Sequence, residues 1–97
     1  MVTGKMFTLN LYGPLYAMTG KKAVQYALSE SIPTIHDLLT ALFNEYPDLH
    51  AIVFDGDNLA EYMSIVINGT ILGGTGWKST TISPSDRVSL FKGESGG

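Results

Sequence analysis

Apolar and polar residues alternate near the start of the chain. In residues 5–12, the apolar Phe7, Leu9 and Leu11 are separated by polar side chains. Neighbouring side chains of a strand point to opposite faces, so this stretch predicts a strand with one apolar face. The same period of two returns over 23–28, after a turn signal, and predicts a second strand that forms a hairpin-like pair with the first.

The apolar spacing changes to that of a helix after Thr34. Apolar side chains stand at positions 35, 38, 39, 42, 43 and 46, which share one helical face. Thr34 can cap the first backbone N–H groups, Asp37 places a negative charge in the first turn, and Pro47 cannot continue a helix. The pattern predicts a helix over 35–46.

Strand signals return in the second half. Residues 48–62 favour no single element, but 63–67 is rich in β-forming residues, and Asn68-Gly69 is a strong signal for a two-residue hairpin turn into a return strand. Alternation over 87–92 predicts a last strand.

Counted without the short return strand after Asn68-Gly69, the order of these elements is β-β-α-β-β, with one helix available to cover one face of a sheet. The predicted fold class is therefore α+β. The 97 residues, of which 44% are hydrophobic and 15% charged, describe one domain, which we place at 1–92, followed by a short tail at 93–97.

Charge and cysteine content exclude several function classes. The net charge is −3, and Lys21-Lys22 is the largest basic cluster, so the chain lacks the electrostatic footprint of a nucleic-acid-binding protein. Without cysteine there is no disulfide and no thiolate site. No apolar stretch approaches the roughly 20 residues of a membrane span, so we expect a cytoplasmic protein without membrane contact.

Three motifs suggest ligand sites but fail on spacing. The segment at 73–79, GGTGWKS, lacks the glycine that a phosphate loop has before its lysine. Asp55 and Asp57 are not followed by the further ligands of a calcium loop. His36 and His50 lack the spacing of a helical metal pair, and we expect both at the surface. The sequence predicts no metal site.

Two aromatic residues near the end of the chain are candidate partner contacts. For Trp77, packing within the protein is the favoured interpretation and contact with a partner the alternative. Phe91 is out of phase with Val88 and Leu90, so it should lie on the opposite face of the last strand. Partner contact and structural packing are equally open for Phe91.

The chain ends in GESGG. Residues 92–97 contain three glycines and no apolar side chain, and fully extended they reach roughly 20 Å. Such a thread can bring the terminal carboxylate into another protein's active site, and glycine keeps the thread narrow. The alternative is an ordinary frayed terminus.

Several segments together resemble one known family. They are the opening strand MFTLNLYGPL, the stretch PTIHDLLTALFNEYPDL, the hairpin VING, the turn and strand SPSDRVSLF, and the terminal GG. In this order they are similar to the β-grasp, ubiquitin-like sulfur carriers, which include the small subunit of molybdopterin synthase and the thiamin sulfur carrier. The chain departs from that pattern at Ser85, where the family often has glycine, and at Lys92-Gly93, where it often has two prolines.

The resemblance implies a β-grasp fold with a mixed sheet, and a mechanism. An E1-like enzyme would use ATP and magnesium to adenylate Gly97, and a sulfur donor would convert the adenylate into a thiocarboxylate. Gly96 and Ser95 would act as spacers, and Phe91 would pack against the activating enzyme or a larger catalytic synthase subunit. The chain itself would be no enzyme and would bind no cofactor stably.

The resemblance leaves several functions open. Molybdopterin formation is the favoured use of the sulfur. Transfer RNA thiolation, thiazole synthesis and amino-acid synthesis are alternatives, as is a ubiquitin-like modifier joined through Gly97 to lysines of target proteins. A plain interaction domain with an incidental tail is the remaining class.

Overall fold

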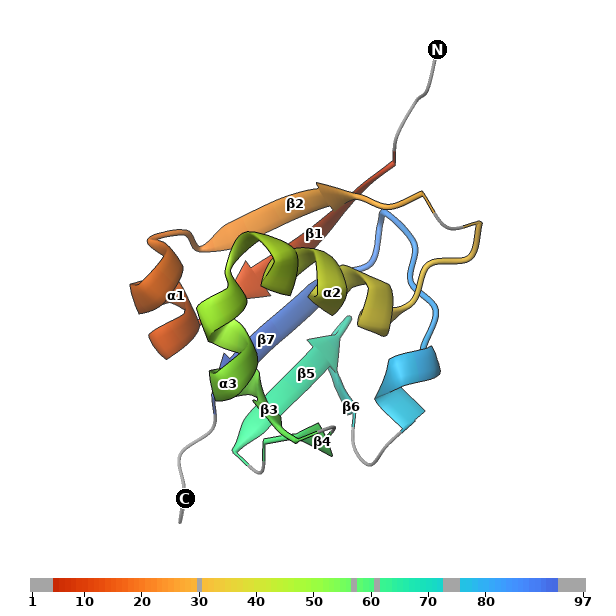
Figure 1. Ribbon diagram of the computed structural model, residues 1–97. Helices are drawn as coiled ribbons and strands as arrows, with labels where there is room; N and C mark the ends of the chain where they lie inside the picture. The colour runs from red at the N-terminus through yellow and green to blue at the C-terminus, as the bar shows by residue number, and fades with distance from the viewer. Residues whose placement is uncertain (1–4, 30, 57, 61, 73–75, 93–97) are drawn as a thin grey trace.

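A five-stranded mixed sheet with helices packed against it forms the body of the protein (Figure 1). This computed structural model describes residues 5–29, 31–56, 58–60, 62–72 and 76–92. The predicted α+β fold class is confirmed, and the sheet contains one strand more than the predicted order β-β-α-β-β.

The sheet has the strand order β2-β1-β7-β5-β6. Strand β7 pairs in parallel with β1 and antiparallel with β5, which makes the sheet mixed, and β1–β2 and β5–β6 are antiparallel pairs as predicted. A separate two-stranded sheet joins β3 and β4. The strands are β1 (Met6–Leu11), β2 (Ala23–Ala27), β3 (Phe54–Asp55), β4 (Asn58–Leu59), β5 (Met63–Ile67), β6 (Thr70–Leu72) and β7 (Val88–Lys92).

The main helix, α2 (Ile35–Glu45), ends one residue before the predicted boundary. The hydroxyl of Thr34 accepts a hydrogen bond from the backbone N–H of Asp37, and the Asp37 carboxylate accepts one from the backbone N–H of Thr34. This reciprocal capping box satisfies two of the N–H groups that a helix start leaves unpaired. No helix within the described ranges is long and apolar enough to cross a membrane.

A short helix, α1 (Pro14–Thr19), lies between the first two strands where the sequence indicated only turns. Proline is tolerated at the first helical position because its missing N–H would be unpaired there anyway. Gly20 ends the helix in the left-handed region, with φ 73°. Six residues are too few to show a helical period, although Leu15 is completely buried.

The stretch that favoured no single element folds into several short ones. It contains the 3-10 helix η1 (Pro47–Leu49), helix α3 (His50–Val53) and the strands β3 and β4. Leu49 and Val53 are buried, so this segment closes one end of the core.

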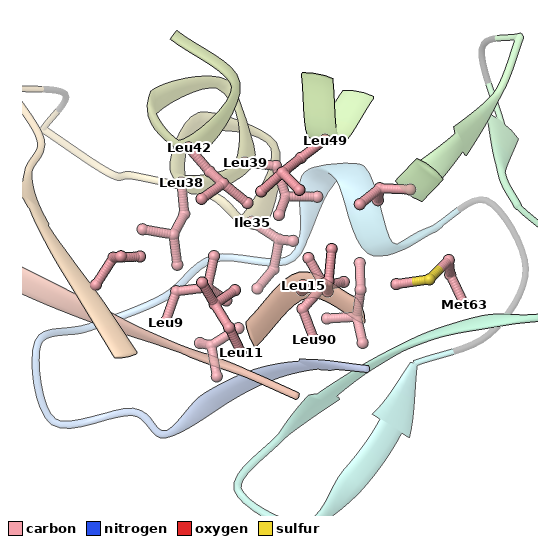
Figure 2. Close-up of a cluster of buried hydrophobic side chains, with 14 of the residues drawn as sticks. Leu9, Leu11, Leu15, Ile35, Leu38, Leu39, Leu42, Leu49, Met63 and Leu90 are labelled. Carbon is pink, nitrogen blue, oxygen red and sulfur yellow. The ribbon is translucent and has the colours of Figure 1, made fainter. Parts of the chain in front are cut away.

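The core lies between α2 and the sheet. Figure 2 shows side chains of α2 pointing toward Leu9, Leu11 and Leu90 of the sheet, with Leu15 of α1 beside them. The α2 contribution consists of Ile35, Leu38, Leu39 and Leu42, all at most 1% exposed. Because each strand turns alternate residues toward α2, the alternation in the sequence becomes one continuous apolar layer.

Trp77 belongs to this core. It lies in the 3-10 helix η2 (Gly76–Ser79), is 2% exposed, and its ring centroid is 5.6 Å from that of Phe54. Packing is therefore the correct interpretation of Trp77, which is too deeply buried to contact a partner. Residues 73–75 of the glycine-rich segment lie outside the described residues.

We expect Trp77→Ala to lower the free energy of unfolding by about 3–5 kcal/mol, because truncating a buried aromatic leaves a cavity. Urea unfolding followed by circular dichroism measures this. Tyr16→Ala is the control, since Tyr16 is 44% exposed and its loss should cost at most about 0.5 kcal/mol. Equal, small effects of both substitutions would contradict the assigned position of Trp77.

Candidate functional site

The sheet face opposite α2 is formed by the residues that alternate with the core positions. In β7, Val88 and Leu90 are buried, whereas Ser89 and Phe91 between and beyond them are partly exposed. The predicted face of Phe91 is therefore confirmed. Phe91 is the penultimate residue of the strand, so Lys92 alone separates it from the C-terminal tail at 93–97.

Phe91 contacts residues from two neighbouring strands. It stands opposite Ser64 of β5 in the antiparallel pairing. Its ring makes an edge-to-face contact with Tyr12, which directly follows β1, at 6.4 Å between centroids and an interplanar angle of 87°. This arrangement is favourable for two aromatic rings and fixes the orientation of Phe91.

Further apolar side chains continue this surface across the sheet. Val66 of β5 stands opposite Ser89 of β7 on one side and opposite Ile71 of β6 on the other. Ile71 is 65% exposed and Tyr12 is 51% exposed. We call Tyr12, Val66, Ile71 and Phe91 the Phe91 patch.

A shallow hollow lies within the Phe91 patch. Its lining consists of Tyr12, Gly13, Val66, Ser89, Phe91 and Lys92. Among the described residues, this lining offers two aromatic rings, the side chain of Val66, a hydroxyl and an ammonium group. Its apolar contact area suits it to binding apolar side chains of a partner.

Sequence reasoning identified Phe91 but missed the other three residues of the Phe91 patch. Val66 and Ile71 are apolar side chains in the outward phase of their strands, and Tyr12 continues the outward phase of β1 just past its end. The signal becomes a surface only when the strand order is known, because the four residues lie on, or directly after, four different strands.

Lys92, the last residue of β7, makes a second contact at the end of the strand. Its ammonium lies 4.7 Å from the ring centroid of Tyr62, a cation–π contact. The end of β7 is therefore fixed by the contact of Phe91 with Tyr12 and by that of Lys92 with Tyr62. The predicted reacting residue Gly97, its spacers Gly96 and Ser95, and the whole tail at 93–97 lie outside the described residues.

The two histidines are exposed, as expected. The His50 ring packs edge-on against Phe43 and Phe54, with centroids 5.2 and 5.0 Å apart. Within the described part of the chain, no three histidine or carboxylate side chains gather into a group that could hold a metal ion. Asp57, one of the two aspartates considered for calcium, lies outside the described residues.

Two side chains with shifted pKa values lie away from the Phe91 patch. Burial raises the pKa of the Tyr26 phenol, and its hydrogen bond to the Glu45 carboxylate raises it further. The hydrogen bond from Asn68, followed by one from the backbone N–H of Ser83, holds the pKa of Asp86 below its ordinary value. Both shifts arise from contacts that hold elements together, and neither bears on the hollow.

We expect Leu90→Ala and Phe91→Ala to differ sharply in stability although the residues are neighbours. Leu90 is completely buried, so its truncation should cost about 2–5 kcal/mol. Phe91→Ala removes mainly the contact with Tyr12, and we expect a loss of about 1 kcal/mol. Urea unfolding of both variants measures the difference, and a larger loss for Phe91→Ala would mean that the two faces are exchanged.

Comparisons with known proteins agree with this architecture. The model of the ThiS family matches residues 9–97. SAMP1, the small archaeal modifier protein 1 of Haloferax volcanii, is 25% identical, with a TM-score of 0.78 over 95% of this chain and 99% of its own. SAMP1 of Methanosarcina acetivorans is 22% identical, with a TM-score of 0.78 over 99% of this chain and 100% of its own.

A more distant likeness is to a chain in the BexX/CysO complex of Amycolatopsis orientalis. It is 15% identical, with a TM-score of 0.74 over 94% of this chain and 99% of that one. No curated protein is a significant match. Because the family model covers nearly the whole chain and the solved structures share its mixed sheet, this protein belongs to the ThiS family and has the ubiquitin-like β-grasp fold of its sulfur carriers.

Proposed function

We propose that this protein carries sulfur as a thiocarboxylate at Gly97 and donates it in the formation of molybdopterin, as the small partner of a larger catalytic synthase subunit. The observation that supports this most directly is the position of the Phe91 patch. Its residue Phe91 lies at the end of β7, where Lys92 alone separates it from the glycine-rich tail. A partner that binds there is therefore close to the terminal carboxylate.

The chemistry requires activation before sulfur transfer. A carboxylate does not react with a sulfur nucleophile until one of its oxygens is converted into a good leaving group. The Gly97 carboxylate attacks the α-phosphorus of ATP and releases pyrophosphate. A sulfur donor then attacks the acyl carbon and releases AMP. The chain has no cysteine, so its terminus is where it can carry sulfur in this way.

All catalytic groups in this proposal belong to partners. An E1-like enzyme holds ATP and magnesium, and a separate donor supplies the sulfur. This chain contributes a binding surface and a substrate group. The hollow at Phe91 supports that division, because its described lining offers apolar contact area for a partner.

The Phe91 patch would provide most of the binding energy for these partners. Aromatic side chains at the centre of an interface commonly dominate its affinity. Tyr12 and Phe91 are positioned against one another before binding, so little side-chain entropy is lost when the partner docks. Ile71, largely exposed, extends the contact toward the edge strand β6.

A second candidate function is protein modification, in which Gly97 forms an isopeptide bond with a lysine of a target protein. The names of two structural neighbours, which describe them as small archaeal modifier proteins, favour this candidate. Both functions begin with the same adenylate, so one chain can serve both. Transfer of the sulfur to transfer RNA, thiazole or an amino-acid precursor would use the same thiocarboxylate.

Mass spectrometry of the intact protein tests the proposal. After incubation with an E1-like enzyme, ATP, magnesium and a sulfur donor, we expect the mass increase of one oxygen-to-sulfur exchange, located at Gly97. A variant that lacks Gly96 and Gly97 is the control and should stay unmodified while keeping its fold. An unchanged terminus, under conditions that convert another member of the family, would contradict the proposal. Cellular lysines that carry the remnant Gly-Glu-Ser-Gly-Gly, which trypsin leaves by cleaving after Lys92, would instead support the modifier function.

We further expect Phe91→Ala to raise the KM of the activating enzyme for this protein by about tenfold or more, since truncating a central aromatic contact often costs more than about 1 kcal/mol. The kcat should change little, because the reacting carboxylate is intact. Ile32→Ala is the matched control: Ile32 is 70% exposed but lies outside the lining of the hollow. Equal kinetics for both variants would show that the Phe91 patch is not the docking surface.

A further inference from the structure

The turn between β5 and β6 contains a reactive pair of residues, Asn68-Gly69. Both adopt positive φ, 51° and 86°, as a two-residue hairpin turn requires. An asparagine followed by glycine is also the sequence most open to spontaneous deamidation, because glycine has no Cβ to hinder ring closure at its backbone nitrogen. The same two residues that give the turn its positive φ angles therefore also make Asn68 prone to deamidation.

Deamidation proceeds by ring closure. The backbone nitrogen of Gly69 attacks the side-chain carbonyl carbon of Asn68 and loses its proton, and the side-chain nitrogen leaves as ammonia. Water then opens the succinimide to aspartate or isoaspartate. For the attack, the Asn68 carboxamide must rotate so that its carbon meets the Gly69 nitrogen.

The structure holds that carboxamide in a different place. Its oxygen accepts a hydrogen bond from the backbone N–H of Arg87 at 2.8 Å, and its nitrogen donates one to a carboxylate oxygen of Asp86 at 3.0 Å. The backbone N–H of Asn68 also donates to the Arg87 carbonyl at 2.9 Å. Both ends of the side chain are thus bound to the segment that leads into β7, and rotation toward Gly69 must break both side-chain bonds.

Asp86 is itself fixed. Its second carboxylate oxygen accepts from the backbone N–H of Ser83 at 2.8 Å, and its own N–H donates to the Ser83 carbonyl at 3.0 Å. The hydrogen bond from Asn68, and after it the one from the backbone N–H of Ser83, lower the pKa of Asp86, so its carboxylate stays ionised and remains an acceptor near neutral pH. A hydrogen bond to a charged acceptor is stronger than one between neutral groups.

We propose that Asn68 is a deamidation site that Asp86 suppresses in the folded protein. Replacement of the Asn68 nitrogen by an oxygen would set two carboxylates at the distance of the present hydrogen bond, where like charges repel. Isoaspartate would in addition lengthen the backbone of the turn. Either product loosens the connection between the β5–β6 hairpin and the start of β7. The proposal is independent of the function of Gly97.

Peptide mapping by mass spectrometry during prolonged incubation at mildly alkaline pH tests this. In Asp86→Ala, Asn68 should deamidate about tenfold faster than in the unchanged protein, which corresponds to the loss of ~1.4 kcal/mol of protection. The unchanged protein, unfolded in urea, gives the deamidation rate of Asn68 without protection. In the folded protein the deamidation rate should be well below that value. Asp86→Asn keeps one acceptor oxygen, so Asn68 should deamidate in it at an intermediate rate. This second variant tests the proposal even if Asp86→Ala fails to fold.

A control separates this effect from general loss of stability. Val24→Ala lowers the stability of β2, two strands away from β7, without touching the turn. It should leave the deamidation rate of Asn68 nearly unchanged. The proposal is overturned if Val24→Ala accelerates the reaction as much as Asp86→Ala, if folded Asp86→Ala and Asp86→Asn both react at the unchanged rate, or if folding gives no protection.

Discussion

The pairing of β7 between β1 and β5 is the constraint on which the rest of the structure depends. It brings the last strand of the chain into the middle of the sheet, parallel to the first. Its register turns Leu90 toward α2 and Phe91 toward the opposite face. A slip of one residue would exchange the two faces. One register therefore determines both the packing of the core and the presence of an apolar patch beside the tail.

Local signals explain which elements the sequence could predict. The α2 helix extends over three turns with a cap and a terminating proline, and the Asn68-Gly69 turn has the φ angles that its sequence demands. The helices α1 and α3 contain six and four residues, too few for an apolar period to appear. Their formation depends on burying Leu15 and Val53 against the rest of the core, which is a tertiary effect.

The Phe91 patch also depends on tertiary contacts that no local pattern in the sequence predicts. The outward phase of Phe91 follows from alternation within one strand, but its contact with Tyr12 follows from the parallel pairing of two strands at opposite ends of the chain. Trp77 illustrates the reverse case. A tryptophan in a segment rich in glycine and serine has no periodic context, and in the core it packs against Phe54, from the short β3 strand. In both contacts, Phe91 with Tyr12 and Trp77 with Phe54, the two residues lie far apart in the sequence, so no local pattern predicts them.

The end of β7 also sets a geometric condition on any partner. Sulfur carriers that resemble this chain often have two prolines after the aromatic residue, which restrict the backbone. Here Lys92 is fixed instead by pairing with Met63 and by its contact with Tyr62, and glycine follows at once. The five residues at 93–97 span at most roughly 17 Å from that fixed point. A partner that binds the Phe91 patch and reacts with Gly97 must therefore place its active site within this distance, so in the proposed function docking and chemistry belong to the same protein surface.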